Sequence, residues 1–171
     1  MTSEIFGRID LWARNLTPFA LTLLLVLLSV VPLPIRGYAQ VSPALVLAAV
    51  YFWSIHRPDL LPAPAVFAAG LTFDLLSGAP VGMTALVLLL THSVVVSQRR
   101  FFLGKSFLVA WWGFMMVAVA AMAAVWILAM IMQGQLLDPL PTVFRYLLTL
   151  CLYPALAVLF VLAQRSFLRQ K

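Results

Sequence analysis

The chain has 171 residues, of which 64% are hydrophobic and only 9% are charged, and its mean hydropathy is +1.08. Soluble domains are about half apolar and about a quarter charged, so this composition excludes an ordinary soluble domain and indicates an integral membrane protein. The net charge of +6 does not indicate a nucleic-acid partner, because the basic residues form short clusters between apolar segments, as orientation signals of membrane proteins do.

Apolar segments predict a single transmembrane domain, residues 1–171, with six spans. Residues 3–15 form an amphipathic segment that suits a helix lying in the membrane interface, and a frayed polar terminus is the alternative. The spans are expected at about 17–31, 41–55, 62–77, 83–96, 107–132 and 143–164. A cleaved signal peptide is the alternative for the first span. We favour an uncleaved anchor.

The second and third spans are short, at about 15 residues against the ~20 that a perpendicular helix needs to cross a bilayer. We expect them to thin the bilayer, to extend into the interface or to be partly buried in protein. At the end of the second span, Tyr51 and Trp53 are expected to form an interfacial aromatic belt.

Six spans place both termini on one side of the membrane, and the distribution of basic residues predicts which side this is. With cytoplasmic termini, nine basic residues lie inside and two lie outside. The inside set is Arg8, Arg14, Arg57, Arg99, Arg100, Lys105, Arg165, Arg169 and Lys171, and the outside set is Arg36 and Arg145. This division follows the positive-inside rule, so we expect a multi-pass protein with both termini in the cytoplasm.

The stretch from Pro62 to Gly82 is apolar except for Asp74. An ionisable residue in an apolar span is costly and marks a candidate functional site. Because Asp74 lies in the last turn before Gly78, its charge opposes the dipole of its own helix. We therefore expect it to be held by backbone donors of a neighbouring segment or by a cation, with Arg145 and Arg36 as the candidates.

After Asp74, the segment 77–82 predicts a chain reversal. Gly78 and Gly82 can adopt positive φ, and Pro80 donates no hydrogen bond. We expect a node near the outer face that is either structural or partner-binding, and two roles for its carboxylate stay open: tying its own turn together, or acting directly in complex formation. The candidate residues are Gly70, Asp74, Gly78, Pro80, Gly82 and Arg145.

The remaining polar residues do not predict an enzyme, a cofactor or a metal site. No two carboxylates share a predicted span, which argues against paired acid–base chemistry. His56 and His92 lack metal-ligand spacing, and we expect His92 to form a hydrogen bond between helices. The single cysteine, Cys151, excludes an intramolecular disulfide and is expected to serve packing.

Three motifs lie together near the middle of the chain: Tyr51-x-Trp53, Arg57-Pro58 and Gly70-x-x-x-Asp74-Leu-x-x-Gly78-x-Pro80-x-Gly82. They resemble the signature region of the bacterial rod shape-determining MreD family, as do the size, the six-span hydropathy and the late Pro154. Val81 stands where leucine is expected. The resemblance implies a fold similar to the six-helix substrate-binding subunits of energy-coupling-factor vitamin transporters.

By the same resemblance, the protein is a non-enzymatic inner-membrane subunit of the cell-elongation complex, the elongasome. It is expected to bind the bitopic scaffold MreC and to help couple cytoskeletal MreB to periplasmic peptidoglycan synthesis and cell shape. RodA and the elongation-specific penicillin-binding transpeptidase are the expected indirect partners, beside membrane lipid.

Two other functions are weighed against this one. A substrate-binding subunit of a vitamin transporter shares the expected fold, but the Ala-x-x-x-Ala spacing typical of such subunits is missing from the first span. A small membrane enzyme or flippase is disfavoured by the few polar residues. The sequence leaves open whether the protein is a monomer or a homo-oligomer.

Overall fold

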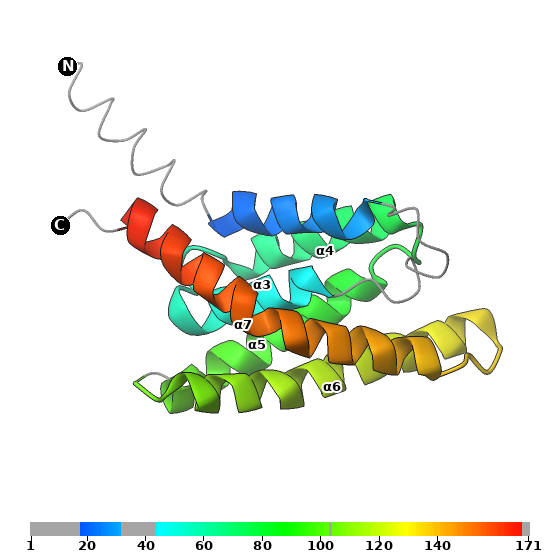
Figure 1. Ribbon diagram of the computed structural model, residues 1–171. Helices are drawn as coiled ribbons and strands as arrows, with labels where there is room; N and C mark the ends of the chain where they lie inside the picture. Colours follow the sequence, from blue (N-terminus) through cyan, green and yellow to red (C-terminus); the bar gives the residue numbers. More distant parts are fainter. Residues whose placement is uncertain (1–17, 32–43, 103, 169–171) are drawn as a thin grey trace, which may run out of the picture.

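The computed structural model describes residues 18–31, 44–102 and 104–168, and every regular element in these ranges is an α-helix (Figure 1). The helices are Pro18–Val30, α3 (Leu45–His56), α4 (Ala63–Ser77), α5 (Met83–Phe102), α6 (Phe107–Gln133) and α7 (Leu140–Leu168). The predicted all-α class is confirmed for this part of the chain.

Each expected span coincides with one helix, but several boundaries differ by a few residues. Helix α5 continues to Phe102, past the expected end at 96, because hydropathy detects only the apolar part of a helix whose last turns are polar. Helix α7 begins at Leu140 rather than 143, where the Asp138 carboxylate accepts a hydrogen bond from the Leu140 N–H at 3.0 Å. The predicted interfacial segment 3–15 and the start of the second span, 41–43, lie outside the described residues.

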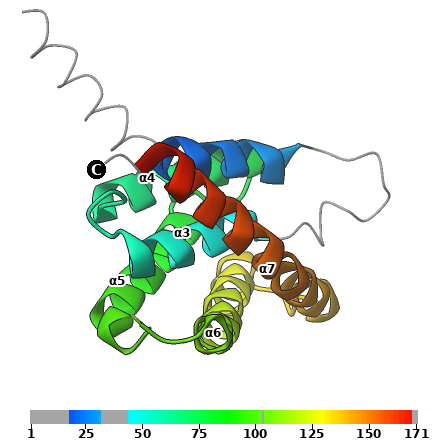
Figure 2. The ribbon, with the colours of Figure 1, turned by 60° about the vertical axis from the view of Figure 1, so that its left-hand side comes forward.

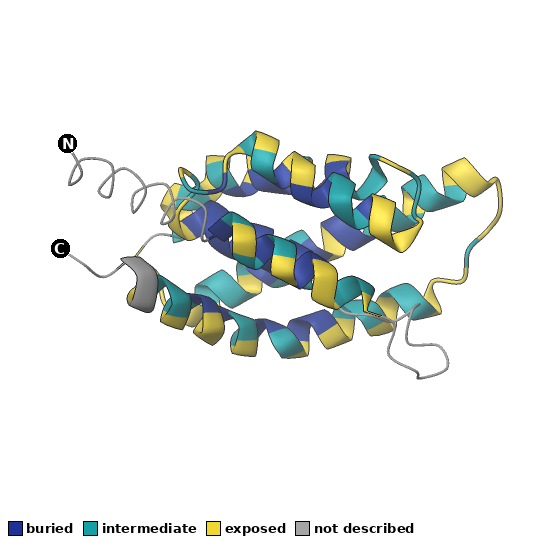
Figure 3. Ribbon diagram, turned by 90° about the horizontal axis from the view of Figure 1, so that it is seen from above, coloured by how far each residue is buried: buried dark blue, intermediate teal, exposed yellow. Residues whose placement is uncertain are grey.

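Large apolar side chains cover the outside of the bundle. The side chain of Met116 is 73% exposed and that of Ile131 is 72% exposed, and Figure 3 shows buried residues turned to the interior with exposed ones outside. Soluble monomers rarely expose large apolar patches. The segments Phe107–Gln133 and Leu140–Arg165 are each long and apolar enough to cross a bilayer. These features together fit a helical membrane protein.

Helix α3 lies in the middle of the bundle, with the other helices around it (Figure 2). Every residue from Val46 to Ile55 is buried, so this short helix is embedded in protein rather than in lipid. The expected aromatic belt is therefore wrong: Tyr51 and Trp53 are at most 1% exposed. The Tyr51 hydroxyl instead donates a hydrogen bond to the carbonyl of Ala110 in α6, at 2.8 Å.

The described helices run back and forth between two ends of the bundle (Figure 1). The end that we call the basic end, on the left of Figure 1, has the α3–α4 and α5–α6 loops and the last turns of α7. The other end, which we call the Asp74 end, has the α4–α5 turn and the α6–α7 loop. The elements at the basic end carry Arg57, Arg99, Arg100, Lys105 and Arg165.

Candidate functional site

Asp74 is 0% exposed, and its carboxylate accepts hydrogen bonds from three backbone amides at the start of α5. The Gly82 and Ala85 N–H groups donate to Oδ2 at 3.0 and 3.3 Å. The Thr84 N–H lies 3.2 Å from Oδ1 and 3.1 Å from Oδ2. Such amides have no partner within their own helix. Asp74 thus caps a helix to which it does not belong, and we call this group of four residues the Asp74 cap.

The Asp74 cap accounts for a charge that opposes its own helix. In α4 the carboxylate lies near the C-terminal end, where the helix dipole is unfavourable, but it also lies at the N-terminus of α5, where the dipole favours an anion. The sequence predicted that either backbone donors or a cation would bind this carboxylate, and the structure shows backbone donors. Of the two cations considered, Arg145 and Arg36, the second lies outside the described residues.

Gly70 allows α4 and α5 to approach closely enough for the Asp74 cap to form. A Cβ atom added at Gly70 would lie 2.5 Å from Cα and 2.9 Å from the amide nitrogen of Ala85. Gly70 precedes Asp74 by four residues, so both lie on the same face of α4. The glycine therefore brings the first turn of α5 against that face, and the carboxylate one turn later reaches the amides.

The turn itself uses backbone conformations that favour glycine. Gly78 ends α4 with φ of 69°, and Gly82 has φ of 93°; L side chains rarely adopt this left-handed region. The carbonyl of Pro80 accepts a hydrogen bond from the Met83 N–H at 3.1 Å. The predicted chain reversal is confirmed, and the five candidate residues from Gly70 to Gly82 form one unit at the Asp74 end.

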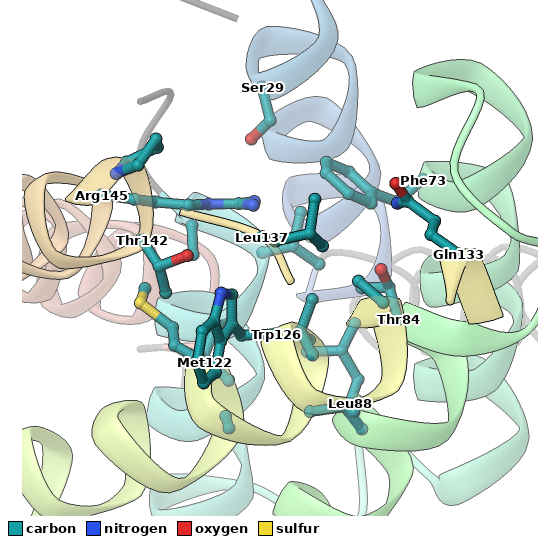
Figure 4. A pocket seen from close by; sticks show the side chains of 18 of the residues that line it. Ser29, Phe73, Thr84, Leu88, Met122, Trp126, Gln133, Leu137, Thr142 and Arg145 are labelled. Carbon is teal, nitrogen blue, oxygen red and sulfur yellow. The ribbon is translucent and has the colours of Figure 1, made fainter. Parts of the chain in front are cut away.

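A cavity of about 680 Å³ lies between the helices next to this unit (Figure 4). Thr84 joins the two, because its amide belongs to the Asp74 cap and its side chain lines the cavity. Most of the wall is apolar. The polar side chains in it are Ser29, Thr84, Gln133, Asp138, Thr142 and Arg145. The volume is within the range of small-molecule sites.

Arg145 extends from α7 into this cavity (Figure 4). Its Nε atom is buried and has no hydrogen-bond partner among the residues that the structure describes. The carboxylate of Asp138, which also lines the cavity, bonds to the Leu140 amide at the exposed start of α7. Arg145 thus lies near the other candidate residues but is not bonded to Asp74.

His92 joins α5 to the central helix, as predicted. Its Nδ1 atom lies 2.7 Å from the hydroxyl oxygen of Ser54, and both residues are buried. The single hydroxyl proton of Ser54 is donated to the carbonyl of Val50 at 2.6 Å, so Nδ1 of His92 is the donor to Ser54. The imidazole therefore holds two helices together.

Sequence reasoning missed Trp126, which lines the cavity and whose indole nitrogen is buried without a hydrogen-bond partner among the described residues. In Figure 4 this nitrogen lies on the ring edge that faces Thr142 and Arg145. The chain has five tryptophans, and nothing local distinguishes this one. Its position follows only from how α6 packs against α7.

A comparison with known protein families covers nearly the whole chain. A family model described as rod shape-determining protein MreD matches residues 12–171, a range that includes the Asp74 cap and the entire cavity wall. No curated protein and no solved structure matches the chain. The family match gives no support to the vitamin-transporter alternative, and the expected likeness to the subunits of such transporters stays a prediction.

Proposed function

The chain belongs to the MreD family of rod shape-determining membrane proteins, and we propose that it is a non-enzymatic subunit of the complex that elongates a rod-shaped bacterial cell. In this proposal it binds an MreC-like bitopic scaffold in the inner membrane. Through the scaffold it helps to couple MreB in the cytoplasm to RodA and the elongation-specific penicillin-binding transpeptidase. The family match over residues 12–171 is the observation that carries the proposal.

We propose six membrane-spanning helices with both termini in the cytoplasm. The alternation of the described helices between two ends supports this, because it gathers five of the described cations at the basic end. Cytoplasmic segments of membrane proteins have an excess of such cations. The basic end then faces the cytoplasm, and the Asp74 end faces the periplasm.

Single cysteines in a Cys151→Ser background test this orientation with a membrane-impermeant thiol reagent added to intact spheroplasts. Gln135→Cys, in the α6–α7 loop, should react from outside, and Arg100→Cys should react only after the membrane is permeabilised. Labelling of Arg100→Cys in intact spheroplasts would contradict the orientation.

A scaffolding role rather than catalysis is supported by how the buried polar groups are used. The carboxylate of Asp74 is occupied by helix amides, and His92 is bonded to Ser54 between two helices. Each of these side chains has a structural partner, so neither is poised as a nucleophile or as a general base.

For the partner surface we propose the outer side of the α4–α5 turn. The Asp74 side chain is 0% exposed, so its part in complex formation is to hold the turn in shape. Close to it, Leu75 is 63% exposed and Val81 is 64% exposed. Both lie at the Asp74 end, where a bitopic scaffold with a periplasmic domain passes the membrane surface.

Co-purification with the MreC-like scaffold tests both the function and the surface. The unmodified chain should retain the scaffold in mild detergent, and Val81→Gln should reduce the retained amount several-fold. Leu136→Gln is the matched control, because Leu136 is 92% exposed in the α6–α7 loop at the same end. If the unmodified chain retains no scaffold, the proposed function is wrong; if Val81→Gln retains it fully, only the proposed surface is wrong.

A further inference from the structure

The cavity between the helices holds Arg145, a cation whose Nε atom has no hydrogen-bond partner among the described residues. We propose that this cavity binds the phosphate-bearing headgroup of a membrane lipid, with Arg145 as the main contact to the phosphate. The proposal goes beyond the scaffolding function and does not rest on it. It follows from the charge of the cavity, from its donors and from an apolar groove beside it.

The guanidinium of Arg145 is the first argument. It enters a largely apolar cavity, and its Nε atom is buried without an acceptor among the described residues. An ionised group in apolar surroundings is costly unless it is paired. A phosphate accepts two parallel hydrogen bonds from a guanidinium, so it would pair with the charge of Arg145 and supply the missing acceptors.

The neighbouring polar residues support an anion rather than a cation. Trp126 contributes a second buried donor without a partner, its indole nitrogen, on the side that faces Arg145 (Figure 4). The carboxylate of Asp138 accepts a hydrogen bond from the Leu140 amide at 3.0 Å and is exposed at the start of α7. It therefore serves the helix terminus, and the cavity interior keeps two donors that an acceptor-rich headgroup would satisfy.

A second hollow indicates a lipid rather than a free anion. A groove of about 230 Å³ adjoins the cavity between α6 and α7 and shares Met122, Trp126 and Thr142 with it. The rest of its wall is Val119, Ala123, Pro139, Val143 and Tyr146. Such a groove suits an acyl chain that leaves the cavity after the phosphate is bound at Arg145.

Dodecyl phosphate is a probe with both parts of this ligand, and its binding to the purified full chain in a neutral maltoside detergent is measured by calorimetry. We expect saturable binding of one molecule. Dodecanol, which has the chain without the phosphate, and inorganic phosphate, which has the charge without the chain, should each bind at least about tenfold more weakly.

Arg145→Gln should weaken the binding of dodecyl phosphate by about tenfold or more, because hydrogen bonds to charged groups are the strong ones. Arg145→Lys keeps the charge and should retain part of the affinity. Arg165→Gln, on the same helix at the basic end, is the matched control and should bind normally. Trp126→Phe should weaken binding about threefold. Trp111→Phe should not, because the Trp111 indole nitrogen also has no partner among the described residues but lies outside the cavity.

Asp138→Asn keeps a capping oxygen for α7. It should raise the affinity for dodecyl phosphate about twofold, since it removes a negative charge that repels the phosphate.

Saturable binding that depends on Arg145 and on the alkyl chain supports the proposal. Equal affinity for inorganic phosphate would show a site for a soluble anion and would overturn the lipid assignment. Equal affinity of folded Arg145→Gln, or failure of the unmodified chain to bind, would overturn the site.

Discussion

Two hairpins meet at the Asp74 end, and each places a charged side chain inside the protein. In the α4–α5 hairpin, the Asp74 carboxylate is fully buried and accepts hydrogen bonds from three amides. In the α6–α7 hairpin, the Arg145 guanidinium is partly buried, and its Nε has no acceptor among the described residues. The hydrogen bonds of Asp74 are supplied by the protein itself, whereas Arg145 is available to a partner outside the described residues.

This difference separates two roles that the sequence groups together. A buried charge with complete hydrogen bonds contributes to stability, because its removal leaves the buried donors without an acceptor. A charge without partners contributes little to stability and is available to a ligand. Stability measurements on variants of the two hairpins, made by reversible unfolding in lipid-free mixed micelles, test this comparison directly.

The largest effect is expected for Asp74→Asn, which should lower the free energy of unfolding by about 2–3 kcal/mol. The carboxamide offers one oxygen to amides that now share two, and its NH₂ group faces other donors. Asp138→Asn is the matched control, and it should change the free energy of unfolding by less than about 0.5 kcal/mol because asparagine caps a helix as well as aspartate. Equal stability of the two variants would contradict the Asp74 cap.

Gly70→Ala should lower the free energy of unfolding by about 2 kcal/mol, within the range of overpacked cores. The added Cβ would meet backbone atoms of Ala85 at 2.5 and 2.9 Å, and backbone cannot move aside as a flexible side chain can. Ala68→Leu adds more volume to an exposed position of the same helix and should be almost neutral. If Gly70→Ala is neutral too, the close approach of α4 and α5 is not required.

A smaller loss of about 1 kcal/mol is expected for Gly78→Ala, because φ of 69° is costly for an L side chain. The space around Gly78 is open, so no clash adds to this cost. Gly78→Asn should lose less than Gly78→Ala, since asparagine tolerates the left-handed region better. A larger loss for Gly78→Asn than for Gly78→Ala would show that the left-handed backbone conformation is not the reason for glycine at this position.

The smallest effect is expected for Arg145→Gln, which should leave the free energy of unfolding within about 0.5 kcal/mol or raise it. The reason is that it removes a partly buried charge whose Nε has no partner among the described residues. Arg165→Gln, at the far end of α7, serves as the reference. A loss of about 2 kcal/mol or more would mean that the guanidinium is bonded within the protein, and the contrast between the two hairpins would disappear.

Much of the helical framework was predictable because its signals are local. Long apolar runs predict helices, and the glycines and proline of 77–82 predict the reversal between α4 and α5 wherever the rest of the chain lies. The unusual position of Asp74, an acid at the wrong end of its helix, also pointed to a partner outside that helix. The motif from Gly70 to Gly82 resembles the MreD family, and the family model that matches residues 12–171 confirms this assignment.

Three features depended on the tertiary structure. Tyr51 and Trp53 have the composition of an interfacial belt, but α3 is enclosed by other helices and its aromatic residues are core. The choice between amides and a cation at Asp74 depended on how closely Gly70 lets α5 approach. The cavity brings together Thr84, Trp126 and Arg145 from three different helices, and six helices contribute to its whole wall. Sequence periodicity describes one helix at a time, whereas burial and pairing are properties of the space between helices.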